Sequence, residues 1–382
     1  MEYVRLKDIG QIITGNTPPT SKPEYYGDYM PFIKATDIPI GVKCTLVTEQ
    51  SYSKLAAEKY KKSLVPKGST CVVTIGSIGK KMTYAHTDLF VNQAINAIVP
   101  KDSYDNEYIF YNVRCSVLPQ LKKLDSGTTS GRENISKTSF SSIRIPVIKD
   151  KNVQRRIGVI LSTYDSLIEN NTKRIRLLEK MAENLYKEWF VRFRFPEYEK
   201  VEMENGLPKG WKVKRYEDEL NVKYGKGLPT NRLTEDGFPV FGSNGQIGFY
   251  TSYMYDTPQI LISCRGASSG VVNISLPKSF VTNNSLVCEL TDKTESVFEY
   301  LKYYFLNTNL VQYQTGSAQP QITINNVVKL KMLVPSHEVQ CAFSKKIRVI
   351  DKEVANLQNQ NSLLARQRDL LLPRLMSGKL EI

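Results

Sequence analysis

The fold of this chain is indicated by a stretch that it contains twice, TGSAQPQITINNVVKLKMLVP at 315–335 and SGTTSGRENISKTSFSSIRIP at 126–146. In both, a small residue and a glycine lead into a polar run, an isoleucine, and a hydrophobic run that ends in proline. The alignment pairs Ile135 with Ile324 and Pro146 with Pro335, each 189 positions apart. Two copies of one structural unit are the simplest explanation.

Three further pairs of segments extend the repeat over much of the chain. They are VRLKDIGQIITGNTPPT (4–20) with WKVKRYEDELNVKYGKGLPT (211–230), STCVVTIGSIG (69–79) with PQILISCRGASSG (258–270), and FVNQAINAIV (90–99) with FVTNNSLVCE (280–289). Gly15 aligns with Gly225, and Gly76 aligns with Gly266. Short β-type runs separated by Gly, Pro, Asn and Ser predict that each copy begins with a strand-rich region.

Each copy ends in a long charged segment almost free of Gly and Pro, which predicts a helix. Apolar residues recur there with heptad spacing, and the second ladder follows the first by 186 positions. The predicted seam consists of Tyr164, Ile168, Asn171, Ile175, Leu178, Ala182, Leu185 and Trp189 in the first helix, and of Ile350, Val354, Leu357, Asn361, Leu364, Arg368, Leu371 and Leu375 in the second. Such a seam is typical of a coiled coil, in which the polar positions fix the register. The alternative is a helix that only covers its own globular region.

The segment between the copies, FPEYEKVEMENGLPKG at 195–210, is acidic and interrupted by Pro and Gly, which predicts a linker. An antiparallel helix pair with one globular region at each end would follow. We therefore predict an α+β fold: two pseudo-symmetric mixed α/β domains separated by a pair of long antiparallel coiled-coil helices. The predicted boundaries are 1–149 for the first domain, 150–195 for the first helix, 196–210 for the linker, 211–336 for the second domain and 337–382 for the second helix.

Composition limits the function. The 382 residues carry 52 Lys and Arg against 38 Asp and Glu, a net charge of +14, which favours a polyanionic partner such as DNA, RNA or an acidic protein. No apolar run reaches the roughly 18 residues of a membrane span, so we expect a cytoplasmic protein. The six cysteines are widely spaced and contain no CxxC pair, so we expect reduced thiols and no zinc site.

Signatures of catalysis are scarce. His86 and His337 are the only histidines, which leaves few candidates for a histidine-based active site. IGSIGKK at 75–81 lacks the spacing of a phosphate-binding loop, and FGSNGQIG at 241–248 is not a dinucleotide-binding motif. There is also no NPPY-like tetrapeptide of the kind found in amino-methyltransferases. The sequence therefore predicts a binding protein without catalytic residues, metal or cofactor of its own.

The glycine-punctuated loops contain the side chains that nucleic-acid binding requires. Arg and Lys neutralise phosphates and can recognise guanine, whereas Asn and Gln can recognise adenine. The candidate DNA-binding residues are Lys22, Lys34, Lys80, Lys81 and Arg132 in the first copy, and Lys226, Arg232, Asn244, Gln246, Arg265, Gln319 and Gln321 in the second.

Several of these segments together resemble one protein family. They are TGNTPPTSKPEYYGDYMPFIKATDI (14–38), YGKGLPTNRLTEDGFPVFGSNGQIGFY (224–250), ILISCRGASSG (260–270), TGSAQPQITINNVVKLKMLVPS (315–336) and LLLPRLMSGKLEI (370–382). Over essentially its whole length the chain resembles the specificity subunit of a type I restriction-modification enzyme. The first copy has GRENIS where the second has AQPQITI, and the second is closer to the usual family pattern.

The resemblance implies that each globular domain is a target-recognition domain for one half-site of an asymmetric, bipartite sequence in double-stranded DNA. It implies that the helices set the unread spacer and bind two methyltransferase subunits, with restriction/translocase subunits added for cleavage. The chain would be a non-catalytic part of a type I DNA adenine methyltransferase and ATP-dependent endonuclease. S-adenosylmethionine, ATP and Mg would be used by the partner subunits and not bound by this chain.

Two alternatives to this function are open from the sequence. The chain could be the DNA reader of a self-sufficient restriction or methylation enzyme, or a coiled-coil scaffold with no role on DNA. A catalytic domain in the same polypeptide would distinguish the first, and DNA affinity would distinguish the second.

Overall fold

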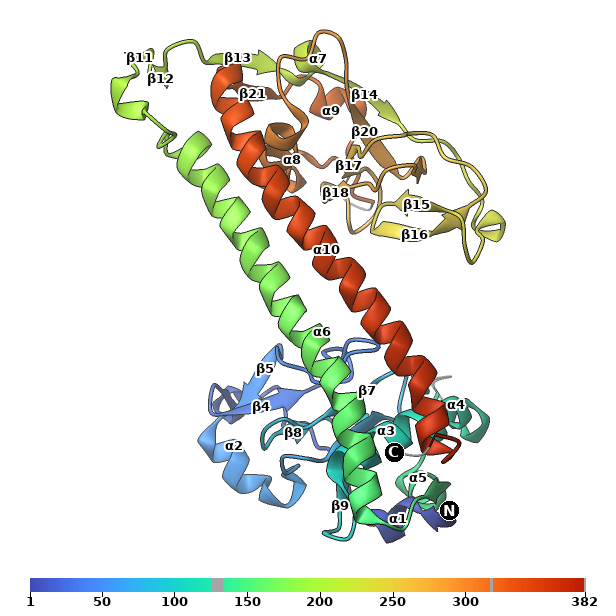
Figure 1. Cartoon of the computed structure of the whole chain (residues 1–382). Coiled ribbons are helices and arrows are strands. Elements are labelled where there is room, and N and C mark those ends of the chain that lie inside the picture. Colours follow the sequence, from blue (N-terminus) through green and yellow to red (C-terminus); the bar gives the residue numbers. More distant parts are fainter. Residues whose placement is uncertain (126–132, 317–318, 381–382) are drawn as a thin grey trace. The chain divides into compact units, whose positions relative to one another are not determined.

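The chain forms two units, each of which combines a β-rich head with parts of two long helices (Figure 1). The computed structural model describes residues 1–125, 133–316 and 319–380. Unit 1 contains Met1–Lys173 and Leu357–Ile382, and unit 2 contains Arg174–Asn356. The long helices, α6 (Lys151–Tyr186) and α10 (His337–Met376), contribute residues to both units.

The first head is built on two small sheets. One sheet is antiparallel, in the order β2 (Gly10–Thr14), β9 (Ile95–Pro100), β6 (Thr70–Val73), β7 (Met82–Tyr84); the other has the order β3 (Tyr26–Gly27), β5 (Gln50–Tyr52), β4 (Met30–Ile33), β8 (Phe90–Val91). β4 and β8 run parallel, and β1 (Glu2–Arg5) pairs separately with β10 (Arg144–Val147). The helices are α1 (Leu6–Ile9), α2 (Lys54–Lys59), α3 (Asn106–Ser116), α4 (Leu118–Leu121) and α5 (Lys137–Ser142), with 3-10 turns at Pro23–Tyr25, Lys61–Ser63 and Lys122–Leu124.

The second head repeats this topology. Its antiparallel sheet has the order β14 (Leu220–Tyr224), β20 (Ser285–Leu290), β17 (Ile260–Ser263), β18 (Val272–Ile274); a second sheet has the order β16 (Gly245–Tyr250), β15 (Phe238–Gly242), β19 (Phe280–Val281), with β15 and β19 parallel. β13 (Lys212–Arg215) pairs with β21 (Lys331–Val334) as β1 pairs with β10. The helices are α7 (Tyr216–Glu219), α8 (Phe298–Leu306) and α9 (Ile324–Val327), with 3-10 turns at Thr230–Arg232 and Val311–Tyr313.

Central strands of both heads are buried on both faces. β6 (TCVV) and β17 (ILIS) are buried at every position, and three of the four residues in each are apolar. Short, mostly apolar runs between turn signals suit such doubly covered strands. The mixed α/β heads and the long helices confirm the predicted fold class.

Backbone hydrogen bonds correct the sequence alignment of the repeat. Ile135 donates to the carbonyl of Thr74 at 2.9 Å, and Ile322 donates to that of Cys264 at 3.0 Å. Ile135 therefore corresponds to Ile322, and its pairing with Ile324 was wrong. The prolines that close the repeat are shifted by the same two positions. The sequence match followed single residue types, whereas the hydrogen bonds fix the true register.

One buried glutamine at the start of each long helix holds the N-terminus of a head helix. Gln154 accepts from the N–H of Asp105, the residue before α3, at 2.9 Å. Gln340 accepts from the N–H of Val297, the residue before α8, at 2.8 Å. Both glutamines are buried, and their amide groups also donate to carbonyls that precede the long helix. The repeat therefore extends to buried hydrogen bonds between head and helix.

A tyrosine and an aspartate form a second equivalent connection. Tyr111 of α3 donates to Asp165 of α6 at 2.5 Å, and Tyr303 of α8 donates to Asp351 of α10 at 3.0 Å. Burial is the largest cause that raises the pKa of both tyrosines, and the neighbouring aspartate raises it further. Both phenols are therefore protonated and serve as donors.

Within unit 1, α6 and α10 run antiparallel along the predicted seam. The buried Arg368 forms an ion pair with the buried Asp165, and the amide of Asn171 donates to Gln360 at 3.4 Å. Asn361 donates to Thr172 at 3.3 Å. Asp165 of α6 thus contacts Arg368 of α10, whereas the later Asn171 contacts the earlier Gln360. This order shows that the two helices are antiparallel.

Within unit 2 the same two helices are again antiparallel, but their contact is mostly apolar. Arg174 and Glu353 form an exposed ion pair at 2.9 Å, and Ala182 and Trp189 share a core with Ile350. Trp189 lies in a π-helical turn, Lys187–Val191, that continues α6. All sixteen residues of the predicted seam are buried or partly buried in their units.

The segment predicted to be a linker contains regular structure. A 3-10 turn at Tyr198–Lys200 precedes a hairpin of β11 (Met203–Glu204) and β12 (Leu207–Pro208). Asn205 and Gly206 form its turn with φ values of 52° and 79°. Asn-Gly is the usual pair for a two-residue turn that needs positive φ at both positions, a signal that the linker prediction overlooked.

Replacing Arg368 with Met is expected to lower the free energy of unfolding by about 3–5 kcal/mol, because a buried carboxylate loses its cation. Chemical denaturation of the full chain measures the change. The triple variant Arg368→Met, Asp165→Leu, Tyr111→Phe should recover most of the loss. The matched control is Arg174→Met, which breaks an exposed pair and should cost less than about 1 kcal/mol. Equal losses in Arg368→Met and Arg174→Met would contradict the buried ion pair.

Candidate nucleic-acid interface

Backbone hydrogen bonds connect most of five neighbouring loops in the second head. Lys226 donates from its backbone N–H to Val281 at 2.9 Å, Cys264 to Asn284 at 2.9 Å, and Gly266 to Pro320 at 3.1 Å. The loops contain residues 225–227, 243–245, 264–270, 282–284, and 315–316 with 319–321; we call them the second loop platform.

The first head has an equivalent platform at residues 15–17, 34–37, 74–81, 92–94 and 133–134. Asn16 donates to Val91 at 2.9 Å, and Thr74 donates to Ala94 at 2.8 Å. Gly76 donates to the carbonyl of Glu133 at 3.0 Å. These bonds repeat those of the second platform one for one, so the same backbone frame carries different side chains in the two heads.

A glycine is required where two loops of each platform meet. A Cβ on Gly15 would lie 2.2 Å from the carbonyl oxygen of Val91, and one on Gly225 would lie 2.4 Å from that of Val281. Both distances are shorter than any allowed contact. This close approach of two backbones explains why the sequence repeat keeps a glycine at both positions.

Most predicted DNA-binding residues of the second copy lie on its platform and are exposed. They are Lys226, Asn244, Arg265, Gln319 and Gln321. A backbone bridge joins Arg265 to Gln321, so a cation and an amide are neighbours there. Gln246 follows in β16, and Arg232 lies in the 3-10 turn Thr230–Arg232, outside the platform. Within the described residues, Lys226, Arg232 and Arg265 have no ion pair.

The first copy brings together fewer of its predicted residues. Lys80 and Lys81 lie in the turn between β6 and β7; Lys80 is exposed, and the ammonium of Lys81 donates to the carbonyl of Ala35 at 3.1 Å. Lys34 lies on the platform but forms an ion pair with Glu49. Lys22 is separate, with its ammonium 5.7 Å from the ring centre of Tyr25.

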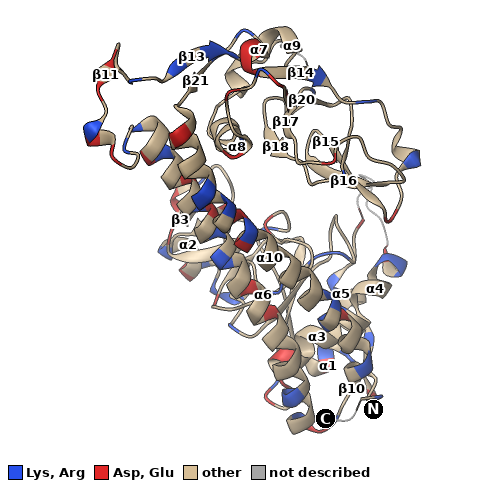
Figure 2. Cartoon of the chain, turned by 45° about the horizontal axis from the view of Figure 1, so that its top comes forward, with Lys and Arg blue, Asp and Glu red and all other residues tan. Residues whose placement is uncertain are grey.

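Arg132 lies outside the residues that the structure describes. Figure 2 shows cations on both heads and a mixture of both signs along α6 and α10, while α7 and β11 are acidic. Lys and Arg are therefore not confined to the loop platforms.

Sequence reasoning missed three polar side chains on the platforms. Gln93 and Asn284 are exposed in the equivalent turns between β8 and β9 and between β19 and β20. Glu133 lies on the first platform, where its carboxylate accepts from the N–H of Ile78 at 3.2 Å. The first two could have been found from the aligned turns VNQA and VTNN, but the acidic residue gave no signal because only cations and amides were considered.

Cysteine chemistry is absent from the described part of the platforms. Burial raises the pKa of Cys264, beneath the second platform, although the nearby Arg265 acts in the opposite direction. Burial alone raises the pKa of Cys71 and of Cys288 to about 12. These thiols are protonated at neutral pH and are not nucleophiles. All six cysteines are free.

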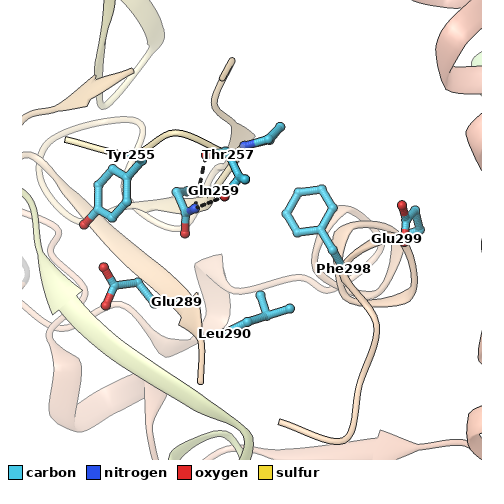
Figure 3. A pocket seen from close by; sticks show the side chains of 8 residues that line it. Tyr255, Thr257, Gln259, Glu289, Leu290, Phe298 and Glu299 are labelled. Atoms are coloured by element: carbon cyan, nitrogen blue, oxygen red, sulfur yellow. Dashed lines mark hydrogen bonds between the residues drawn. The ribbon is translucent and has the colours of Figure 1, made fainter. Parts of the chain in front are cut away.

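A pocket of about 620 Å³ lies elsewhere in unit 2, between the sheet and α8 (Figure 3). Its wall contains Tyr255, Gln259, Leu290 and Phe298, together with two carboxylates. Those carboxylates already have partners: Glu289 pairs with Lys223 at 2.6 Å, and Glu299 pairs with Arg348 at 2.6 Å. The pocket thus offers no free charged group to a ligand.

The described residues contain neither a metal-binding cluster nor a membrane-spanning helix. No group of three or more His, Cys, Asp or Glu side chains in this part of the chain could hold a metal ion. Among the same residues, no helix has both the length and the apolar character needed to cross a membrane.

Comparison with known proteins identifies the family. The family described as "Type I restriction modification DNA specificity domain" matches residues 1–180 and 208–365, most of both repeats. The chain belongs to this family. The two matched regions correspond to the two heads, each with the long helix that follows it, so the internal repeat is a repeat of the family's own domain.

Similar proteins match either nearly all of the chain or about half of it. The type I restriction enzyme MjaIX specificity subunit of Methanocaldococcus jannaschii is 27% identical over 99% of this chain and 93% of its own length. The type I restriction enzyme HindI specificity subunit of Haemophilus influenzae is 32% identical over 47% of this chain and 38% of its own length. The S subunit of a type I restriction-modification system from M. genitalium has the same fold, with a TM-score of 0.59 at 18% identity over 98% of this chain and 95% of its own.

Gly225→Ala is expected to lower the free energy of unfolding by about 1–3 kcal/mol, because the new methyl group would overlap the carbonyl of Val281. Thermal and chemical denaturation measure the loss. Gly227→Ala is the matched control two residues away, since its Cβ would meet no atom of the described residues within 4 Å. If the two variants are equally stable, the close contact between the loops is wrong.

Proposed function

We propose that this chain is the sequence-specific DNA-binding subunit of a type I restriction-modification enzyme. Each head would recognise one half-site of a bipartite, asymmetric DNA sequence through its loop platform. The observation that carries this proposal is that both platforms share one hydrogen-bonded frame but present different side chains. Two domains with the same backbone frame and different surface side chains are suited to recognising two different half-sites.

The second platform has the chemistry for both parts of DNA recognition. Lys226 and Arg265 are exposed and have no ion pair among the described residues, so both are available to phosphates or to guanine. Gln319, Gln321 and Asn244 present amides, which can bond to adenine in the major groove. Phosphate contacts would position the head, and contacts to base edges would supply specificity.

The long helices would bind two methyltransferase subunits, and restriction subunits would join the assembly. The two helices have equivalent exposed faces, and this favours the binding of two identical subunits. Leu177 of α6 and Leu363 of α10 occupy equivalent positions and are 69% and 50% exposed, respectively. Each apolar side chain could contact the same surface on its own partner subunit.

We propose that the chain itself has no catalytic role. S-adenosylmethionine, ATP and Mg would be bound by the methyltransferase and restriction subunits. In this arrangement the present chain determines which adenine is methylated by determining where the assembly binds.

Replacing Lys80, Lys81, Arg232 and Arg265 with Ala should weaken DNA binding by the complex of the full chain with its methyltransferase subunits. The slope of log K against log salt concentration should become shallower by roughly one for each phosphate contact that is lost. Affinity measured at several salt concentrations tests this. Lys149→Ala with Lys200→Ala, at two exposed lysines outside the platforms, should change neither quantity much. Unchanged affinity in the fourfold variant would favour a scaffold without a role on DNA.

Lengthening both helices in register should lengthen the unread spacer and leave the half-sites unchanged. Seven residues add about 10 Å at ~1.5 Å per residue, which corresponds to roughly three base pairs. The methylated sequence motif gives the result directly. Insertion into α6 alone is the control, and it should reduce activity because it breaks the seam. A changed half-site in the variant with both insertions would show that the helices do not set the spacing.

A further inference from the structure

The two loop platforms differ in charge at one equivalent position. Gly76 donates to the carbonyl of Glu133 at 3.0 Å, and Gly266 donates to that of Pro320 at 3.1 Å. The residue two positions later, Ile135 or Ile322, closes the same second bond in each head. Position 133 of the first head therefore corresponds to position 320 of the second, so a carboxylate replaces a proline.

The carboxylate of Glu133 is held at the tip of the turn between β6 and β7. One of its oxygens accepts from the N–H of Ile78 at 3.2 Å, and the side chain remains partly exposed. The neighbouring Gly76 has a φ of 86°, and a Cβ there would meet no atom of the described residues within 4 Å. One hydrogen bond leaves a carboxylate with further acceptor positions. Glu133 is thus fixed in place and can accept again.

A carboxylate on a DNA-binding surface does not bind the phosphates, because both groups are negatively charged. It can only accept hydrogen bonds, so any partner that it finds on the DNA is a base edge that donates. In the major groove cytosine presents only the N4 amino donor, whereas adenine places the N7 acceptor beside its amino group. Repulsion from N7 makes adenine the poorer partner for a carboxylate.

We propose that Glu133 is a specificity-determining residue that recognises the N4 amino group of a cytosine in the half-site of the first head. The second head has no counterpart, because Pro320 has no polar side chain. The inference rests on the proposed function and adds to it one base at one half-site.

The test uses Glu133→Gln in the full chain, purified with its methyltransferase subunits. The glutamine oxygen can still accept from Ile78, so the turn keeps its hydrogen bond, while the new NH₂ group favours an acceptor. Selection of bound duplexes from a random-sequence pool yields both half-sites for each variant. We expect the preference for cytosine at one position of one half-site to fall by roughly tenfold or to change to adenine.

The other half-site serves as the internal control and should not change. Glu2→Gln, which removes an exposed carboxylate paired with Lys149 in the same head but outside the platform, controls for the loss of a negative charge and should alter no base preference. Two unchanged half-sites in Glu133→Gln would overturn the role of Glu133 and leave the proposed function intact. Failure of the unmodified complex to select any motif would overturn both.

Discussion

The hydrogen bond between a tyrosine of each head and an aspartate of a long helix is the contact on which the rest of the structure depends. Tyr111 bonds to Asp165 in unit 1, and Tyr303 bonds to Asp351 in unit 2. Each bond joins a helix of the head, α3 or α8, to the long helix that follows that head in the chain, α6 or α10. Because these groups are largely buried, neither partner could be lost without leaving a polar group unsatisfied.

The two equivalent aspartates, Asp165 and Asp351, form ion pairs with cations from different elements. In unit 1 the cation is Arg368, which comes from the opposite helix, whereas in unit 2 it is Lys302 of the head helix, at 2.7 Å from Asp351. Ala182 occupies the position that is equivalent to Arg368 and cannot supply a charge. Divergence of the copies has therefore kept both carboxylates paired, the buried Asp165 and the partly exposed Asp351. The frame is conserved between the two copies, while the residues that complete it are not.

Much of the architecture could be predicted from the sequence because it depends on periodicity. The heptad ladder from Tyr164 to Trp189 and its repeat gave the two long helices, and the aligned glycines Gly15 and Gly225 marked a contact that permits no side chain. The exact register of the repeat could not be predicted, since a two-residue shift changes few residue types but every backbone hydrogen bond. The hairpin at Asn205 was missed because its composition was interpreted as a linker.

The binding surface was less predictable than the fold. Residue type gave Lys80, Arg265 and Gln321 as candidates, but the loops that carry them meet only through tertiary hydrogen bonds. Ion pairs also decide which cations are available, as the pairing of Lys34 with Glu49 illustrates. Glu133 had no signal in the sequence, because its significance depends on its position beside a turn far away in the chain.

The most direct test of the central claim is a genome-wide map of methylated adenine in cells that express the methyltransferase subunits with and without this chain. We expect one motif that is present only with the chain, made of two short, different half-sites on either side of a fixed run of unspecified bases. If the same adenines were methylated in cells with and without the chain, the proposed function would be wrong.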